Sequence, residues 1–190
     1  PINSSLDSLN KVMYFIQDWR DFNVHCGVLN FEIARFIKKN NFSQYPILSG
    51  DFMNEIFADY TEEKIGNKIF YKQLKLENYL RSKLFINGLQ SSDRENGIFS
   101  GLGLKIYQPY FILLDCFKNL DKNFFKKNNK YSFMGKILPY DIFKLVGRKK
   151  TRAQITDKDG GILNYFISKN INQDKLIRIF SQKYKVSSLW

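Results

Sequence analysis

Large apolar side chains recur at spacings of three and four residues along most of this 190-residue chain. Such spacing is typical of amphipathic helices, whose apolar stripe faces a core. It predicts helices over residues 5–19, 30–39, 49–57, 69–85, 109–128, 139–146, 162–168 and 173–183. We therefore expect a mostly α fold, a single compact helical domain of about seven or eight helices.

The same spacing predicts which side of each helix is buried. In the helix over 30–39 the apolar face consists of Ile33, Phe36 and Ile37, and the following Asn40-Asn41 is typical of a helix end. In the helix over 139–146 the inward residues are Ile142, Phe143 and Val146. Both faces are expected to contribute to the core.

One stretch near the middle of the chain interrupts the helical pattern. Residues 91–97 have the composition of a turn or loop, and Gly101 and Gly103 follow closely. Apolar and other residues then alternate over 102–107, which predicts a short strand, and residues 131–137 are expected to be extended. The region near 90–103 is thus a predicted hinge or loop, and a mixed α+β fold is the alternative.

Charge divides the chain unevenly on the two sides of this region. Residues 1–115 contain 13 Lys or Arg and 13 Asp or Glu, whereas residues 116–152 contain 11 basic residues and only two acidic ones, Asp121 and Asp141. The net charge of +12 is therefore concentrated in the C-terminal part. We expect a neutral helical part, residues 1–103, and a basic helical part, residues 104–190, within one continuous domain. A local positive field favours an anionic partner.

Codon bias explains part of this composition but not its distribution. The chain is rich in Lys, Asn, Ile and Phe and contains only three alanines, which is typical of an AT-rich genome. Such a bias raises Lys everywhere, yet it does not remove Asp and Glu after Asp115. The missing acidic residues therefore indicate a binding surface, with a merely solvated face as the alternative.

The basic residues of this part form two groups. Four lysines at intervals of four give a cationic stripe along the predicted helix over 109–128 and just past its end, and a basic pentad follows Gly147. The pentad includes two arginines, whose planar guanidinium can hold a phosphate with two hydrogen bonds. Aromatic residues lie between the two groups, and exposed rings stack on the bases of single strands. The predicted nucleic-acid-binding residues are Lys118, Lys122, Lys126, Lys127, Lys130, Tyr131, Arg148, Lys149, Lys150 and Arg152.

Several classes of site find little support in the sequence. His25 is the only histidine and Cys26 and Cys116 lie far apart, so neither a typical zinc site nor a disulfide framework is expected. No cofactor is predicted. No segment resembles a signal peptide or is long and apolar enough for a transmembrane helix, so we expect a cytoplasmic protein, in the host cytoplasm if the source is viral.

The sequence therefore predicts a protein that grips the phosphate backbone of nucleic acid, with RNA or single-stranded DNA favoured, and performs no chemistry of its own. The neutral part offers a surface for a protein partner. One alternative is a Mg²⁺-dependent nuclease, because carboxylates cluster at Asp51, Glu55, Asp59 and Glu62 before Glu63-Lys64. A second alternative is a polybasic module that contacts an acidic protein or an anionic membrane.

Overall fold

The computed structural model describes residues 8–51, 53, 63–65, 68–70, 91–112, 135–136, 138–146 and 161–185. The chain forms two compact units, and each is built from separate stretches of sequence. The first unit consists of Pro1–Ile47, Asp93–Tyr107 and Lys150–Trp190, and the second consists of Leu48–Ser92 and Gln108–Lys149. These boundaries differ from the charge boundary near residue 115.

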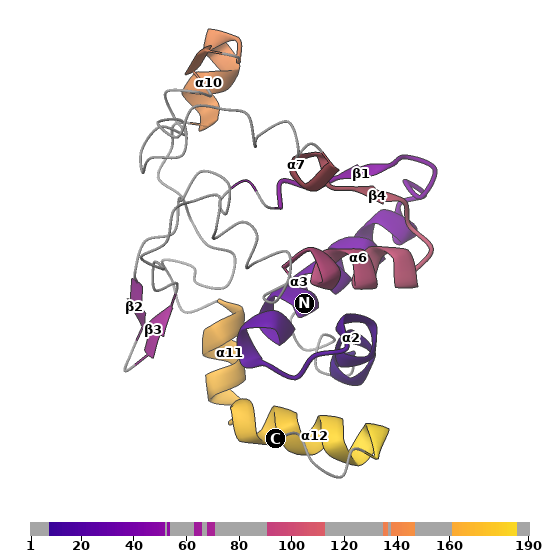
Figure 1. Cartoon of the computed structure of the whole chain (residues 1–190), viewed down its shortest axis with the longest axis vertical. Coiled ribbons are helices and arrows are strands. Elements are labelled where there is room, and N and C mark those ends of the chain that lie inside the picture. Colours follow the sequence, from indigo (N-terminus) through magenta and orange to yellow (C-terminus); the bar gives the residue numbers. More distant parts are fainter. Residues whose placement is uncertain are drawn as a thin grey trace. The chain divides into compact units, whose positions relative to one another are not determined.

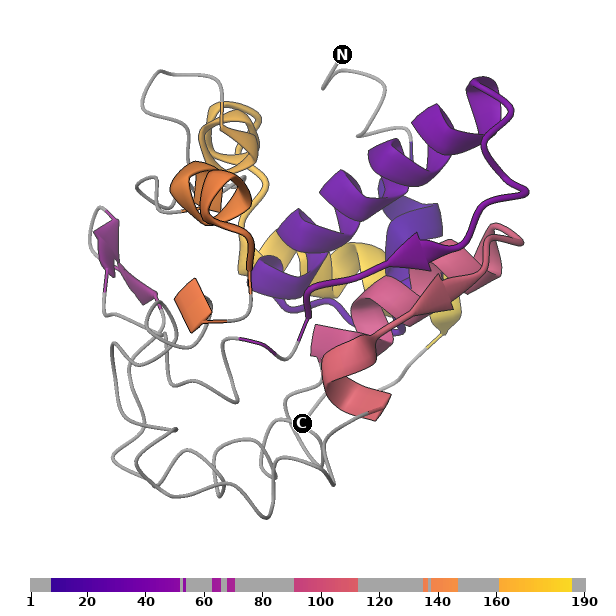
Figure 2. The same ribbon diagram turned by 90° about the horizontal axis from the view of Figure 1, so that it is seen from above.

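Helices make up most of the described residues (Figure 1 and, seen from above, Figure 2). They comprise six helices of seven residues or more and the four-residue α7, with only short strands, so the predicted mostly α class is confirmed. The helices are α2 Leu9–Ile16, α3 Asp21–Lys39, α6 Ser91–Gly101, α7 Pro109–Ile112, α10 Tyr140–Val146, α11 Ile162–Ser168 and α12 Gln173–Tyr184. The strands are β1 Ile47–Leu48, β2 Glu63–Ile65, β3 Lys68–Phe70 and β4 Ile106–Tyr107.

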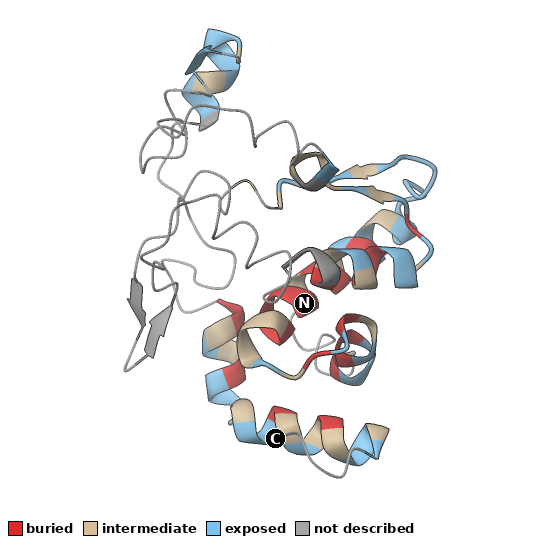
Figure 3. Cartoon of the chain, in the orientation of Figure 1, coloured by how far each residue is buried: buried red, intermediate tan, exposed pale blue. Residues whose placement is uncertain are grey.

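The core of the first unit collects side chains from five helices. Met13 of α2, Val24 of α3, Ile98 of α6, Phe166 of α11 and Leu176 of α12 are all at most 1% exposed. Figure 3 shows the buried residues on the facing sides of these helices. Segments from both ends of the sequence and from its middle are therefore needed to build one core.

Glycines allow two helices to approach α2 closely. A Cβ at Gly27 of α3 would lie 2.8 Å from Val12 Cγ1. On α6, a Cβ at Gly97 would overlap the backbone carbonyl of Phe15, and one at Gly101 would overlap the Phe15 ring. Glycine at these positions therefore permits packing that any larger residue would obstruct.

The loop predicted over residues 91–97 is wrong, because these residues belong to α6. Gly97 and Gly101, which suggested a turn, are the contact points with Phe15, and Ile98 and Phe99 are buried in the core. Tertiary packing thus stabilises a helix whose local composition favours a turn. The predicted hinge near 90–103 reduces to the short turn after α6.

Three helices of the first unit end in the same way. Their chains turn through a residue with positive φ, namely Asn41 after α3, Gly103 after α6 and Asn170 after α11. After α3, the Asn41 N–H donates to Lys38 O at 3.2 Å and the Phe42 N–H donates to Ile37 O at 3.0 Å. The same pair of hydrogen bonds closes the other two ends, which is the Schellman arrangement. The end predicted from Asn40-Asn41 is therefore confirmed.

The apolar face predicted for the C-terminal half of α3 is mostly wrong. Ile33 is 42% exposed and Phe36 is 62% exposed, and only Ile37 packs against the core. The helix begins at Asp21 rather than at residue 30, so its buried stripe starts earlier and continues through Phe31 and Ala34. Ile33 and Phe36 lie on the opposite side of that stripe, where they face solvent.

The strands are short and form two separate pairs. β1 pairs with β4, joined by the Ile47 N–H that donates to Lys105 O at 2.8 Å. The predicted alternation is confirmed over residues 104–107, because Leu104 and Ile106 contribute to the core while Lys105 and Tyr107 are exposed, although only Ile106–Tyr107 form the strand.

The second pair of strands overlaps the start of the helix predicted over residues 69–85. β2 runs antiparallel to β3, with Glu63 opposite Phe70 and Ile65 opposite Lys68. The helix expected from Ile69 therefore does not begin there, and residues 71–85 lie outside the described residues. The sequence Gly66-Asn67 between the strands is typical of two-residue hairpin loops. Helical periodicity alone does not take this signal into account. Gly135 and Lys136, expected to be extended, are helical.

Candidate functional site

The nucleic-acid-binding residues predicted from sequence lie outside the described part of the chain. This applies to both the lysine stripe and the basic pentad, and to the aromatic residue between them. The residues concerned are Lys118, Lys122, Lys126, Lys127, Lys130, Tyr131, Arg148, Lys149, Lys150 and Arg152. Within the basic stretch 116–152, the structure describes residues 135–136 and 138–146.

The described part of the basic stretch exposes both cations and apolar side chains. Lys136 and Lys144 are exposed. On α10, Tyr140 is 75% exposed and Leu145 is 62% exposed. Ile142, which was predicted to face inward, is also exposed, so this prediction is wrong. Helical spacing gives an apolar stripe, but it does not supply the neighbouring element that would cover it.

Of the four candidate magnesium ligands, only Asp51 lies among the described residues. Asp51 lies in a turn after β1, where its N–H donates to Ser49 Oγ at 3.1 Å, so Ser49 caps the turn as its side chain allows. Glu55, Asp59 and Glu62 lie outside the described residues, and the neighbouring Glu63 is on β2. Among the described residues, no three His, Cys, Asp or Glu side chains are grouped closely enough to hold a metal ion.

His25 and Cys26 occupy the core rather than a cleft. His25 is 4% exposed, and its ring packs edge-on against Phe166 with the centroids 4.6 Å apart. Cys26 is buried, with 6% of its surface exposed. Both side chains therefore help to seat α3 against its neighbours, as expected for residues on an apolar helix surface.

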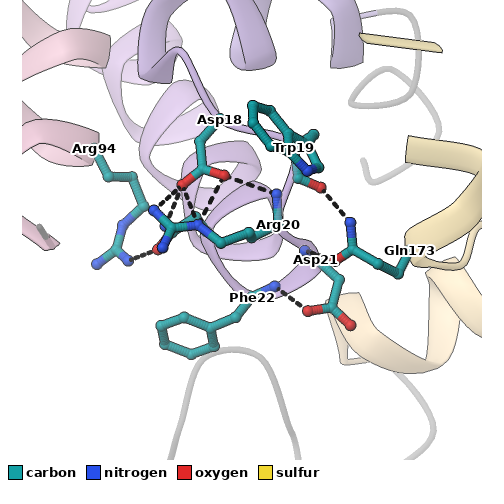
Figure 4. Close-up of polar contacts among 8 residues, drawn as sticks. Asp18, Trp19, Arg20, Asp21, Phe22, Arg94 and Gln173 are labelled. Carbon is teal, nitrogen blue, oxygen red and sulfur yellow. Dashed lines mark hydrogen bonds and ion pairs between the residues drawn. The ribbon is translucent and has the colours of Figure 1, made fainter. Parts of the chain in front are cut away.

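A polar cluster joins α2, α3 and α6 at the turn between the first two (Figure 4). The buried Asp18 carboxylate accepts hydrogen bonds from the Arg20 N–H at 2.8 Å and from Arg20 Nη2 at 2.6 Å. This hydrogen bond raises the pKa of the Arg20 guanidinium. Asn23 donates to Asp18 and accepts from Arg94 Nη1 at 3.2 Å. The arrangement fixes the turn and compensates the buried charge, which is a structural role.

Gln173, at the start of α12, holds the other side of this turn. Its Oε1 accepts from the Asp21 N–H at 2.8 Å, and its Nε2 donates to Trp19 O at 3.0 Å. One amide side chain therefore satisfies a donor and an acceptor of the backbone at the start of α3. The contact links residues 152 and 154 positions apart in sequence.

Exposed aromatic rings and lysines also occur together in the first unit. They lie at the C-terminal end of α3, in the turn that follows, and in or just before β4. Four rings are exposed there, by 62% for Phe36, 61% for Tyr45, and 48% each for Phe42 and Tyr107. Two exposed lysines lie in the same segments, and we use the name aromatic–lysine surface for these six exposed residues, Phe36, Lys39, Phe42, Tyr45, Lys105 and Tyr107.

Backbone contacts hold the parts of this surface together. The Phe42 N–H is bonded to Ile37 O at 3.0 Å, and the Phe42 and Tyr45 ring centroids are 6.5 Å apart. The Ile47–Lys105 hydrogen bond then joins the segment after Tyr45 to β4. Lys38 Nζ donates to Leu102 O at 3.0 Å and so fastens α3 to the turn before β4.

The balance of charge over residues 1–115 as a whole conceals this surface. No Asp or Glu occurs between residues 33 and 50, or between residues 96 and 114. Those two segments contain Arg35, Lys38, Lys39 and Lys105, and they come together in the fold. Counting charge in shorter windows would have revealed them, but the structure was needed to show that they are neighbours.

Comparisons with protein-family models, with characterised proteins and with solved structures found no match for this chain. None of the helices in the described ranges has the length and apolar character required to cross a bilayer.

Proposed function

We propose that this protein binds nucleic acid through the phosphate backbone and performs no chemistry of its own. The observation that carries the proposal is the loss of acidic residues after Asp115, which leaves a surplus of nine positive charges in residues 116–152. The exposed Lys136 and Lys144 and the exposed Tyr140 ring are consistent with a solvent-facing cationic surface in this stretch. The role belongs to the cytoplasm, which is where we expect the protein to act.

The proposed mode of binding depends on charge more than on base sequence. Each phosphate that a lysine or arginine neutralises releases a condensed counterion, so log affinity should fall linearly with log salt. For a single strand the slope is about 0.7 per phosphate contacted. RNA or single-stranded DNA is favoured over a duplex, because the basic stretch contains aromatic residues that can stack on unpaired bases.

The test compares two triple charge reversals in the whole protein. Arg148, Lys149 and Lys150 are changed to Glu in the first variant. Lys175, Arg178 and Lys183, which are exposed on α12, are changed to Glu in the matched control. Both variants replace one Arg and two Lys and change the net charge equally. Affinity for a labelled 20-nucleotide single strand is measured from 50 to 300 mM salt.

We expect the first variant to bind at least tenfold more weakly at 100 mM salt and to show a shallower salt slope, since about three phosphate contacts are lost. The control should stay much closer to the unmodified protein. Equal weakening in both variants would mean that only net charge matters. Affinity that does not vary with salt in the unmodified protein would refute the proposal.

A Mg²⁺-dependent nuclease is the second candidate, and one observation favours it. The sequence layout Asp51…Glu62-Glu63-Lys64 is typical of metal-dependent nucleases when the second part lies on a strand, and Glu63–Ile65 is the strand β2. Incubation with plasmid and with RNA, in Mg²⁺ and in EDTA, tests it. Cleavage that requires Mg²⁺ and disappears in Glu62→Gln would support a nuclease, and intact substrates under all conditions would exclude one.

A further inference from the structure

We propose that the aromatic–lysine surface of the first unit is a second contact site for single-stranded nucleic acid, where bases stack on the exposed rings. This inference rests on the proposed function for the class of ligand, but it concerns a different part of the chain and a different type of interaction. The basic stretch would supply phosphate contacts, and the aromatic–lysine surface would supply base stacking.

The exposure of the rings is the first argument. Phe36 and Tyr45 each expose more than 60% of their surface, although the same unit buries other rings such as Phe166 almost completely. Each ring left in water forfeits the stabilisation that burial would give it. A ligand that covers the rings would recover part of that free energy, and every nucleobase has a flat face that can do so.

Charge selects the class of ligand. The two segments that form the surface contain four basic residues and no acidic one. Glu32, just before the first segment, pairs with Arg35 at 3.1 Å, which leaves three lysines without a carboxylate in these segments. Lys38 and Lys39 lie in the last turn of α3 and offset its negative dipole end, whereas Lys105, just before β4, has no such helical role. Aromatic rings bordered by cations fit a polyanion with stackable groups.

The geometry also suits a single strand more than a duplex. Lys105, just before β4, and Tyr107 on β4 are both exposed, and they alternate with Leu104 and Ile106, which contribute to the core. Phe42 and Tyr45 lie beside each other in the turn that leads to β1. Rings presented from a turn and a strand reach unpaired bases directly, whereas the bases of a duplex are already stacked on one another.

The experiment combines mapped crosslinking with ring substitutions, so that the two binding sites are assessed separately. The whole protein is bound to a 20-nucleotide single strand that contains 5-bromouracil or 4-thiouracil, irradiated, digested and analysed by mass spectrometry. We expect crosslinked peptides from residues 36–45 and from Tyr107. Crosslinks confined to residues 116–152 would overturn this inference but leave the proposed function standing.

The ring substitutions test whether stacking is the interaction. Tyr45→Leu and Tyr107→Leu keep an apolar side chain but remove the aromatic face, so each should weaken binding about tenfold. Tyr45→Trp should restore or exceed the original affinity. The salt slope should not change, because no phosphate contact is removed. Tyr14→Leu on α2, at a ring that is also more than half exposed, is the matched control and should bind normally.

The possible outcomes separate this inference from the proposed function. If the Leu variants bind as tightly as the unmodified protein, the surface does not stack on bases and the inference is wrong. If they bind weakly while the Arg148, Lys149 and Lys150 reversal binds normally, the proposed function is wrong and the aromatic–lysine surface is the principal site. Capture of a protein or of anionic vesicles that the single strand cannot displace would also overturn the inference.

Discussion

Helices α11 and α10 have the same length and the same number of apolar residues, but they differ in how many of these residues are buried. Each has seven residues, five of them apolar. α11 buries Ile162 and Phe166 against α3, whereas α10 leaves Tyr140, Ile142 and Leu145 exposed. Apolar content and spacing therefore determine that a helix can be buried, but burial requires a neighbour. Side chains in the first unit should therefore contribute more to the free energy of unfolding than the exposed side chains of α10.

The largest effect is expected from removing the ring at the centre of the covered helix. Phe166→Ala should lower the free energy of unfolding by about 3–5 kcal/mol, because the ring is 1% exposed and a cavity would remain. Leu145→Ala on α10 should change it by less than about 0.5 kcal/mol. Urea unfolding followed by circular dichroism measures both.

If Phe166→Ala does not fold, Phe166→Leu provides a milder version with the same direction. A loss at Leu145 as large as that at Phe166 would show that α10 is covered in solution, and the contrast between the two helices would not hold.

Glycine substitutions test the tightness of packing in the two regions. Gly97→Ala should cost about 1–3 kcal/mol, since the new methyl group would overlap the Phe15 carbonyl and the backbone cannot easily move. Gly135→Ala, near α10, meets only the Phe143 ring edge at 3.3 Å, and a half-exposed ring can shift. Thermal melts of the two variants should therefore differ by several degrees. Similar melts would indicate that α6 has room to move away from α2.

A polar substitution tests the two hydrogen bonds by which Gln173 connects α12 to the turn before α3. Gln173→Ala removes one hydrogen bond to the Asp21 N–H and one to Trp19 O, both part-buried, so we expect a loss of about 1–2 kcal/mol. Gln182→Ala, at an exposed position of the same helix, should be nearly neutral. Guanidinium unfolding curves for the two variants provide the comparison.

The smallest effect is expected at the end of α11. Asn170→Ala places alanine at φ 50°, a left-handed conformation that alanine tolerates less well than asparagine, so a loss of about 0.5–1 kcal/mol is expected. Asn170→Gly should restore or slightly increase stability. Differential scanning calorimetry is sensitive enough to order the three proteins, and any other order would argue against the left-handed turn.

Local patterns predicted those parts of the fold in which local and tertiary preferences agree. The bounds of α11 and most of α12 followed from periodicity, and the end of α3 followed from Asn40-Asn41. α6 was missed because a glycine that permits helix contact is identical in sequence to a glycine that permits a turn. Only the position of Phe15 in space distinguishes them.

Of the two candidate sites, one could be predicted from the sequence and the other could not. The surplus of charge in residues 116–152 is a property of sequence alone and could be read directly. The aromatic–lysine surface could not, because it joins Lys39 and Tyr45 to Lys105 and Tyr107 across some sixty residues of sequence. Ile33 and Phe36 were assigned to the core for a related reason, since periodicity does not show which of two apolar stripes has a partner.

The hydrogen bonds made by Gln173 have a consequence for folding during translation. The turn at Trp19 and Asp21 leaves the ribosome long before its partner at residue 173 is synthesised. The core of the first unit therefore stays incomplete, with the surfaces that α11 and α12 will cover still open to water, until residues 162–184 have been translated. During that interval the nascent chain should be a substrate for chaperones, and a stop codon before residue 160 should yield a product that is degraded rather than a smaller stable protein.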